Sequence, residues 1–202
     1  MTLFAIPFTC SLAVRLTLDA RGTPHTVQWM RRFEHRLGDG RSYDEALNPK
    51  RRVPALLLPD GELLTEIVAV LVHLDADVPR APAERRRLHE WLCYIATELH
   101  RPTLFALFDP ASPQATVDDL LARALPPVLA LVSDRLADRP TLLGDDTPSP
   151  ADFYLLWGLL LLRFRRPDAL GPTLDRWVAA LTARDTVRTT LADERAKLAV
   201  YG

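Results

Sequence analysis

Residues 53–65 read Val-Pro-Ala-Leu-Leu-Leu-Pro-Asp-Gly-Glu-Leu-Leu-Thr, and this stretch decides the fold. Its two apolar runs, 53–58 and 62–65, flank the turn residues Pro-Asp-Gly, which is typical of a β-hairpin. Residues 66–75 follow with apolar side chains at helical spacing. The sequence therefore predicts a unit of two strands and a helix.

A second unit precedes this hairpin. Residues 2–6 form a short apolar run that predicts a buried strand, and residues 25–30 alternate in the manner of another strand. Between them, residues 11–21 carry apolar side chains on one helical face, and Gly22 is a natural helix stop. Strand, helix and strand in about thirty residues predict a βαβ unit with a right-handed crossover.

The remainder of the chain shows helical periodicity without a convincing strand. The predicted helices cover residues 82–108, 116–137, 150–164, 170–183 and 186–198. We therefore predict an α/β plus all-α fold. A βαβ-ββα domain spans residues 1–76, a Pro- and Asp-rich linker spans 77–81, and an all-helical domain spans 82–202.

Composition narrows the class of protein. The 202 residues are 48% hydrophobic and 25% charged, with a formal net charge of −1, which indicates a soluble globular chain without a general attraction to nucleic acid or to an anionic membrane. The N-terminus has no basic region before its apolar residues, so we expect no signal peptide and a cytoplasmic location. Two cysteines without a Cys/His cluster predict neither a disulfide framework nor a metal site.

Cys10 is the first candidate for chemistry. It lies where the predicted first strand's loop enters the first helix, and free N–H groups at a helix start favour a thiolate, so we expect a lowered pKa. The alternative is a small buried apolar residue, since free cysteines often have that role. For Cys93, in the middle of a predicted helix, we prefer this second interpretation.

Three further positions each allow two interpretations. A cis bond between Val53 and Pro54 would leave the Val53 backbone free to pair with an extended ligand, while the alternative is an ordinary strand start. Glu66 stands where a strand meets a helix, so it either belongs to an anion site or caps the helix. His100 on its long helix is either functional or a surface or core residue.

Several motifs, in this order and spacing, carry a family resemblance. They are residues 9–12 (Thr-Cys-Ser-Leu), 47–56 (Leu-Asn-Pro-Lys-Arg-Arg-Val-Pro-Ala-Leu), 60–66 (Asp-Gly-Glu-Leu-Leu-Thr-Glu), 90–101 and the helix start Ser-Pro-Ala-Asp at 149–152. The last of these also has the form of a capping box, which is a structural feature. Together they resemble the cytosolic glutathione S-transferases, most of all the bacterial beta class.

The resemblance implies a thioredoxin-like N-terminal domain, an all-α C-terminal helical bundle, a homodimer and glutathione as co-substrate, without a metal. It implies catalytic roles for Cys10, beside the glutathione sulfur, and for His100. The glutathione contacts that it implies involve Ser11, Arg36, Arg52, Val53, a cis Pro54, Glu66, the backbone N–H of Ile67, and Glu98 toward the partner subunit's ligand. The family usually has Ser or Gly where this chain has Ile67.

Three functions follow as hypotheses. The first is an enzyme of bacterial detoxification that activates the glutathione thiol for attack on a small apolar electrophile. The second keeps the cysteine but performs glutathione-dependent thiol transfer, reduction or isomerisation. The third is a non-catalytic homologue that binds a ligand. The presence of Cys10, Pro54, Glu66 and His100 together favours an enzyme.

Overall fold

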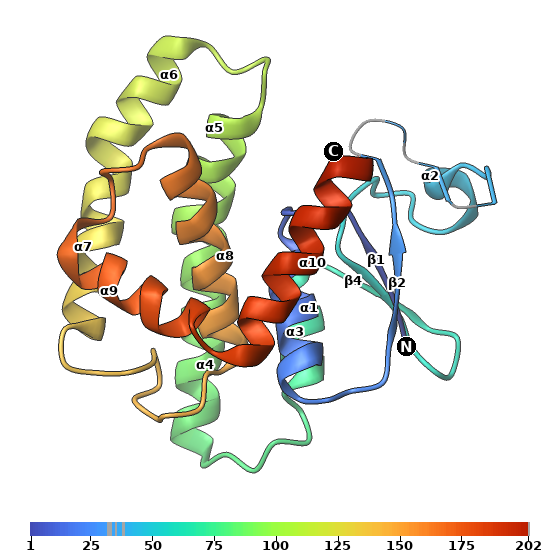
Figure 1. The fold of residues 1–202 in the computed structure, drawn as a ribbon, viewed down its shortest axis with the longest axis horizontal. Coiled ribbons are helices and arrows are strands. Elements are labelled where there is room, and N and C mark those ends of the chain that lie inside the picture. The colour runs from blue at the N-terminus through green and yellow to red at the C-terminus, as the bar shows by residue number, and fades with distance from the viewer. Residues whose placement is uncertain (32–33, 35, 38, 202) are drawn as a thin grey trace. The chain divides into compact units, whose positions relative to one another are not determined.

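A computed structural model of the protein describes residues 1–31, 34, 36, 37 and 39–201 (Figure 1). These residues form two compact units. The first unit joins Met1–Val78 to the C-terminal segment that begins at Thr182, and the second spans Pro79–Leu181. Among the described residues, no helix is long and apolar enough to cross a membrane.

A four-stranded mixed sheet forms the centre of the first unit. Its strands are β1 (Thr2–Ala5), β2 (Thr26–Trp29), β3 (Ala55–Leu57) and β4 (Leu63–Thr65), in the spatial order β2-β1-β3-β4. β1 pairs with β2 in parallel, while β3 pairs with both β1 and β4 antiparallel. The predicted βαβ unit and hairpin are therefore confirmed, and they join at the β1–β3 pair.

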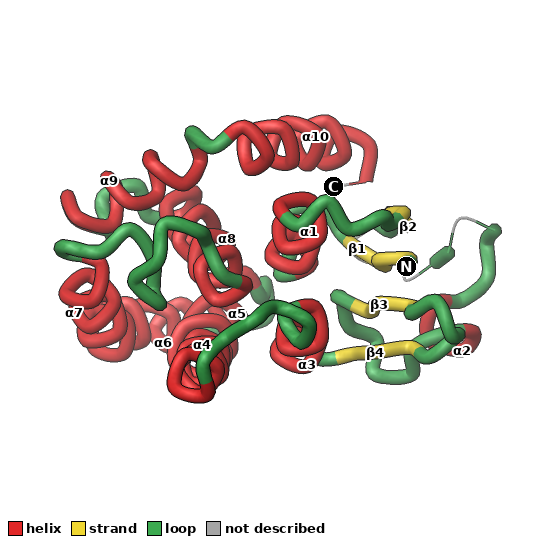
Figure 2. The backbone as a smooth tube through the Cα atoms, turned by 90° about the horizontal axis from the view of Figure 1, so that it is seen from below, coloured by secondary structure: helices red, strands yellow, loops and turns green. Residues whose placement is uncertain are grey.

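Helices cover both faces of this sheet. α1 (Ser11–Ala20) and α3 (Ile67–Leu74) pack on one face, where Figure 2 shows them on the same side of the strands. The short helix α2 (Tyr43–Ala46) lies toward the other face, and the ring of its first residue packs against Phe4 with 6.0 Å between ring centres. The sequence analysis did not predict α2, because a single turn of helix carries no periodic pattern.

The last helix, α10 (Asp185–Tyr201), packs against α1 (Figure 1). The Thr190 hydroxyl donates a hydrogen bond of 2.6 Å to the Asp19 carboxylate, and Arg15 forms ion pairs with Asp193 and Glu194. The sequence analysis assigned this helix to the helical domain, whereas its contacts place it in the first compact unit. Two of the four buried residues of α10, Thr190 and Glu194, are polar, so its sequence does not identify the surface that it packs against.

The second unit is entirely helical in its regular structure. Its elements are α4 (Pro82–Tyr94), η1 (Ile95–Leu104), α5 (Phe105–Phe108), α6 (Gln114–Asp119), η2 (Leu120–Ala124), α7 (Leu125–Leu136), α8 (Pro150–Arg165) and α9 (Gly171–Thr182). The predicted helices 82–108 and 116–137 are present, but each contains a π-helical segment, η1 or η2. In η1 the interior Pro102 has no N–H to donate to the helix ladder, which disfavours the regular α-helical pattern.

η1 and α8 lie in close contact at Gly158. A Cβ atom at this position would lie 2.9 Å from a methyl carbon of Leu99 and 3.3 Å from one of Leu104. Both leucines are buried in η1. The missing side chain at Gly158 therefore lets the two helices approach this closely.

The predicted capping box at the start of α8 is confirmed. The carboxylate of the fully buried Asp152 accepts hydrogen bonds from the Ser149 backbone N–H (2.8 Å), the Ser149 hydroxyl (2.7 Å) and the Leu142 backbone N–H (2.8 Å). Burial raises the pKa of Asp152, and these hydrogen bonds act in the opposite direction. One carboxylate thus ties the preceding loop to the helix start.

We expect Asp152→Ala to lower the free energy of unfolding by about 3 kcal/mol, because two buried backbone N–H groups lose their acceptor. The matched control Ser149→Ala removes only one hydroxyl donor and should cost about 1 kcal/mol. Urea titration of both variants measures the difference. A loss in Asp152→Ala no greater than that in Ser149→Ala would show that the carboxylate does not hold the loop.

Candidate functional site

Cys10 stands at the start of α1, as the sequence predicts, and its side chain is buried. Its Sγ donates a hydrogen bond of 3.2 Å to the backbone carbonyl oxygen of Val53, which lies just before β3. The Val53–Pro54 peptide bond is cis, as expected. The structure therefore joins two of the predicted site residues, Cys10 and Val53, although they are 43 residues apart in the chain.

The expectation of a low pKa for Cys10 is wrong in this structure. Burial raises the pKa of the Cys10 thiol to about 12, and this outweighs the opposing effect of the backbone N–H groups of Cys10 and Ser11. The positive charge of Arg52 lowers the pKa and the negative charge of Glu66 raises it. The helix start is present, but desolvation of the sulfur dominates. Cys10 is accordingly a neutral thiol whose S–H has a carbonyl acceptor.

The loop that leads to Cys10 is stabilised by hydrogen bonds within the loop and by one hydrogen bond to α10. The hydroxyls of Thr9 and Ser11 both donate to the Ile6 carbonyl oxygen, at 2.8 and 3.1 Å, so Ser11 has a structural contact beside its predicted binding role. The backbone N–H of Phe8, a residue with a positive φ of 55°, donates to the Glu194 carboxylate at 2.8 Å. Sequence analysis missed Glu194, because no local pattern connects positions 186 residues apart.

A second network holds the segment that leads to Val53. The carbonyl oxygen of Arg52 accepts hydrogen bonds from the Tyr43 hydroxyl (2.9 Å) and from the Asn48 side-chain amide (2.8 Å). Tyr43 and Asn48 are both buried. The Asn48 side-chain oxygen also accepts from the Lys50 backbone N–H, which closes the turn. The backbone position of Val53 is thus determined by two buried side chains that the sequence analysis did not single out.

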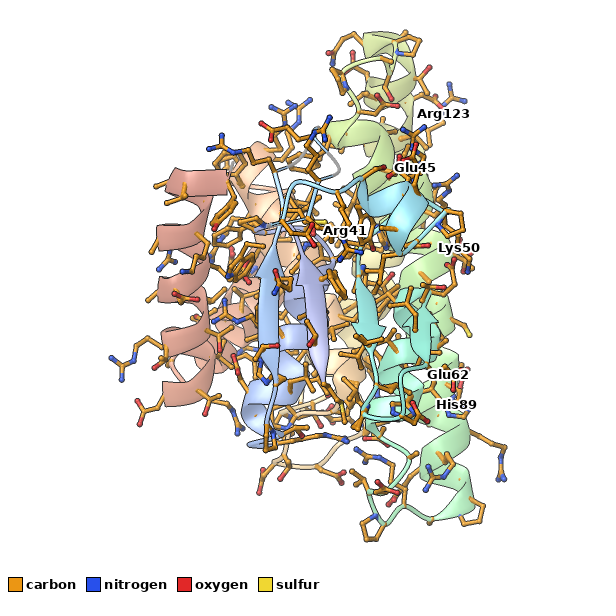
Figure 3. The ribbon with its side chains drawn as sticks, turned by 90° about the vertical axis from the view of Figure 1, so that its right-hand side faces the viewer. Arg41, Glu45, Lys50, Glu62, His89 and Arg123 are labelled. Carbon is orange, nitrogen blue, oxygen red and sulfur yellow. The ribbon has the colours of Figure 1, made fainter. Side chains whose placement is uncertain are left out.

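Glu66 is the residue that precedes α3, and its side chain makes no capping hydrogen bond. Its exposed carboxylate instead receives a hydrogen bond of 3.1 Å from the Lys50 ammonium group, which also donates to the Thr65 hydroxyl at 2.8 Å. Figure 3 shows Lys50 near the end of the sheet beside α2. The capping interpretation of Glu66 is therefore wrong. Lys50 joins the candidate site, and its proximity to Glu66 was not visible in the sequence.

The remaining predicted residues of the first unit differ in their surroundings. Ile67, the first residue of α3, is buried with only 9% of its surface exposed. Arg52 is exposed and acts on Cys10 through its charge. Arg36 is exposed too, and its guanidinium donates at 2.9 Å to the carbonyl oxygen of Gly40 in its own loop. The structure places Cys10, Arg52, Val53 and Glu66 in one neighbourhood, while the contact it gives Arg36 is local.

His100 and Glu98 belong to the second unit, both on η1. The ring Nδ1 of His100 forms a hydrogen bond of 2.6 Å with the hydroxyl of Tyr154 on α8. Burial, together with the charge of Arg101, lowers the pKa of His100 to about 4, so the ring is neutral at neutral pH. Glu98 is exposed. Within the described residues, no three His, Cys, Asp or Glu side chains are grouped so as to hold a metal ion.

Comparison with known proteins decides the family. Residues 9–77 match the glutathione S-transferase N-terminal domain. The chain is also 40% identical over 162 residues to the glutathione S-transferase GstA of Escherichia coli O157:H7, an alignment that covers 77% of this chain and 79% of that protein. The chain belongs to the glutathione S-transferase family.

Solved structures of glutathione S-transferases agree in fold. A ternary complex of BphK, a bacterial glutathione S-transferase, is 29% identical with a TM-score of 0.88, over 96% of this chain and 99% of that one. A glutathione transferase from Methylococcus capsulatus is 32% identical with a TM-score of 0.88, over 96% and 98%. A bacterial beta-class enzyme from Sphingomonas chungbukensis is 27% identical with a TM-score of 0.86, over the same shares.

These comparisons confirm the resemblance to bacterial glutathione S-transferases and the predicted fold, a thioredoxin-like domain followed by helices. They also confirm a transferase-like enzyme of this family and do not favour the alternative functions. The roles of the individual site residues stay predictions.

We expect the free protein to react with iodoacetamide at Cys93 before Cys10, because Cys93 is exposed while Cys10 is buried with a raised pKa. A thiolate at Cys10 would give the opposite order. The sequence analysis expected Cys93 to be buried, and this expectation is wrong because Cys93 is exposed. The Cys10 rate should keep rising with pH well above neutrality, since only the thiolate is the nucleophile.

Peptide mass spectrometry at a series of pH values, with Cys93→Ser as the control for competing label, measures both rates. A Cys10 rate that reaches its plateau near pH 7 would contradict the neutral thiol.

Proposed function

We propose that this enzyme binds glutathione on its first unit and adds the glutathione sulfur to a small apolar electrophile. The observation that carries the proposal is the contact between the Cys10 thiol and the Val53 carbonyl. It brings a sulfur next to the backbone of Val53, the segment that we propose pairs with a peptide ligand. Membership of the family supports glutathione as that peptide.

The tripeptide would use three sets of contacts. The backbone of Val53, presented by the cis Pro54, pairs with the cysteinyl unit. The γ-glutamyl end lies over the start of α3, where the N–H of Ile67 and the side chain of Glu66 meet its carboxylate and amine. The basic side chains Arg36 and Arg52 are proposed near the glycyl carboxylate, and Ser11 near the cysteinyl unit.

The neutral state of Cys10 determines its proposed role. Glutathione must lose its thiol proton to solvent before the sulfur attacks, because the thiolate is the nucleophile. Cys10, as a thiol, then turns its single S–H from the Val53 carbonyl oxygen to the glutathione thiolate and stabilises that charge. The sulfur forms a bond to the electrophilic carbon, and the leaving group departs with its bonding electrons. This role does not need a thiolate at Cys10, whereas thiol transfer through a mixed disulfide does.

Three further features belong to the proposal. A homodimer would place Glu98 near the γ-glutamyl amine of the partner subunit's ligand, and its exposed carboxylate is available for that contact. His100 is proposed to meet the reacting sulfur through its ring. We also propose a cytoplasmic location and a role in detoxification, because conjugation to glutathione removes reactive apolar compounds.

We expect the protein to conjugate glutathione to a chlorodinitrobenzene. We expect it to reduce a small disulfide poorly when glutathione is the reductant. Cys10→Ala should lower kcat on the order of tenfold, because a hydrogen bond to a charged sulfur is worth roughly 1.5–3 kcal/mol. Cys10→Ser, which keeps a donor, should lose less. The thiol-transfer function would instead be established if the wild type reduced the disulfide without conjugating glutathione, and if both variants lost that reduction.

We expect Ile67→Ser to tighten glutathione binding on the order of tenfold, because its hydroxyl adds one hydrogen bond to the γ-glutamyl carboxylate. Because the side chain of Ile67 is buried, the variant should also lose about 2 kcal/mol of free energy of unfolding. Its position at a helix start alone would suggest no such loss. Calorimetric titration with glutathione measures the first effect, and urea unfolding measures the second.

Ile67→Ala is the matched control, since it removes the same apolar bulk without supplying a hydroxyl. Equal tightening in both variants would attribute the effect to bulk rather than to the hydrogen bond. Tight binding by the wild type, with no gain in Ile67→Ser, would show that Ile67 does not weaken the site.

A further inference from the structure

Three aromatic rings gather in the second unit, one from η1 and two from α8. The His100 ring lies edge-on to Trp157, with 4.6 Å between ring centres, and edge-on to Tyr154 at 5.8 Å. Tyr154 and Trp157 stack on each other at 5.9 Å, since residues three apart share one face of a helix. The imidazole is thus confined by two aromatic neighbours.

The backbone around this cluster is equally confined. Gly158 follows Trp157 directly and is the point of close approach between α8 and the η1 leucines on either side of His100. Tyr154 is fully buried, and Trp157 is 3% exposed. Neither helix can shift here without compressing packed side chains, so the ring of His100 and the Tyr154 hydroxyl keep their relative positions.

Chemistry favours one direction for the hydrogen bond between Tyr154 and His100, in which the Tyr154 hydroxyl donates. The Tyr154 hydroxyl lies 2.6 Å from Nδ1 of His100. A phenol is a good donor, and an unprotonated imidazole nitrogen accepts more strongly than a phenol oxygen does. The lowered pKa of His100 leaves the ring neutral, with one N–H. If Nδ1 accepts from Tyr154, that single proton is on Nε2.

We infer that Tyr154 is a positioning residue that fixes His100 as the neutral tautomer with its proton on Nε2. His100 can then donate a hydrogen bond through Nε2 but cannot accept a proton there. It acts as a neutral donor to negative charge on a sulfur or on a leaving group, and not as the base that deprotonates glutathione. The identity of that charged group rests on the proposed function, whereas the tautomer does not.

Nitrogen NMR of the protein labelled with ¹⁵N-histidine tests the tautomer directly. The chain has five histidines, and His100→Asn identifies the signals of His100 by their loss. We expect the wild type at neutral pH to show an unprotonated Nδ1 and a protonated Nε2. In Tyr154→Phe, which keeps the ring and loses only the hydroxyl, we expect a mixture of the two tautomers.

Tyr94→Phe is the matched control, because it removes a hydroxyl from the same unit while the Tyr94 ring packs against Trp91. It should leave the His100 signals unchanged. A wild-type His100 signal with the proton on Nδ1 would overturn the inference, and this result does not depend on whether Tyr154→Phe folds. An unchanged tautomer in a folded Tyr154→Phe protein would overturn it as well.

Kinetics separate this inference from the proposed function. We expect Tyr154→Phe to lower kcat for conjugation on the order of tenfold, with KM for glutathione changed less than twofold, since one hydrogen bond in a buried site is lost. An unchanged kcat would refute positioning by Tyr154. If His100→Asn retains full turnover while the spectra show the expected tautomer, the assignment stands and the proposed role of His100 in the reaction fails.

Discussion

The hydrogen bond from the Cys10 thiol to the Val53 carbonyl oxygen is the contact on which the candidate site depends. It joins the loop after β1 to the segment before β3, and each side is held by buried groups further away. Glu194 on α10 accepts from the backbone of the first loop, while Tyr43 and Asn48 donate to the carbonyl just before Val53. These supports hold the loop with Cys10 and the Val53 carbonyl in place without a ligand, so the proposed glutathione site is largely formed in the free protein. Such preorganisation reduces the entropy lost on binding.

Burial determines the chemistry that this arrangement can perform. A helix start alone lowers a cysteine pKa, but the sulfur of Cys10 has lost its water, and that loss raises its pKa to about 12. The same effect on an imidazole lowers the pKa of His100 to about 4. Both predicted catalytic groups are therefore neutral donors near pH 7. A neutral thiol at Cys10 suits the proposed stabilisation of a glutathione thiolate, and it suits redox exchange at Cys10 poorly.

The sequence predicted what local patterns encode. Turn residues at 59–61, short apolar runs and one alternating segment predicted the sheet, and apolar periodicity predicted the helices of both units. The π-helical segments were missed because the spacing of apolar residues predicts a helix but does not specify which carbonyl each N–H reaches. The supports of the site were missed for another reason: Glu194 and Tyr154 are far in the chain from the residues that they hold, at separations of 186 and 54. The pKa of Cys10 was misjudged since burial is a property of the folded packing and not of position at a helix start.

A crystal structure of the protein with glutathione tests the central claim most directly. The account predicts that the cysteinyl backbone pairs with Val53, that the γ-glutamyl carboxylate lies over the N–H groups at the start of α3, and that the glutathione sulfur lies within hydrogen-bond distance of the Cys10 Sγ. Glutathione bound elsewhere, or a site that stays empty at saturating glutathione while Cys10 keeps its bond to Val53, would contradict it.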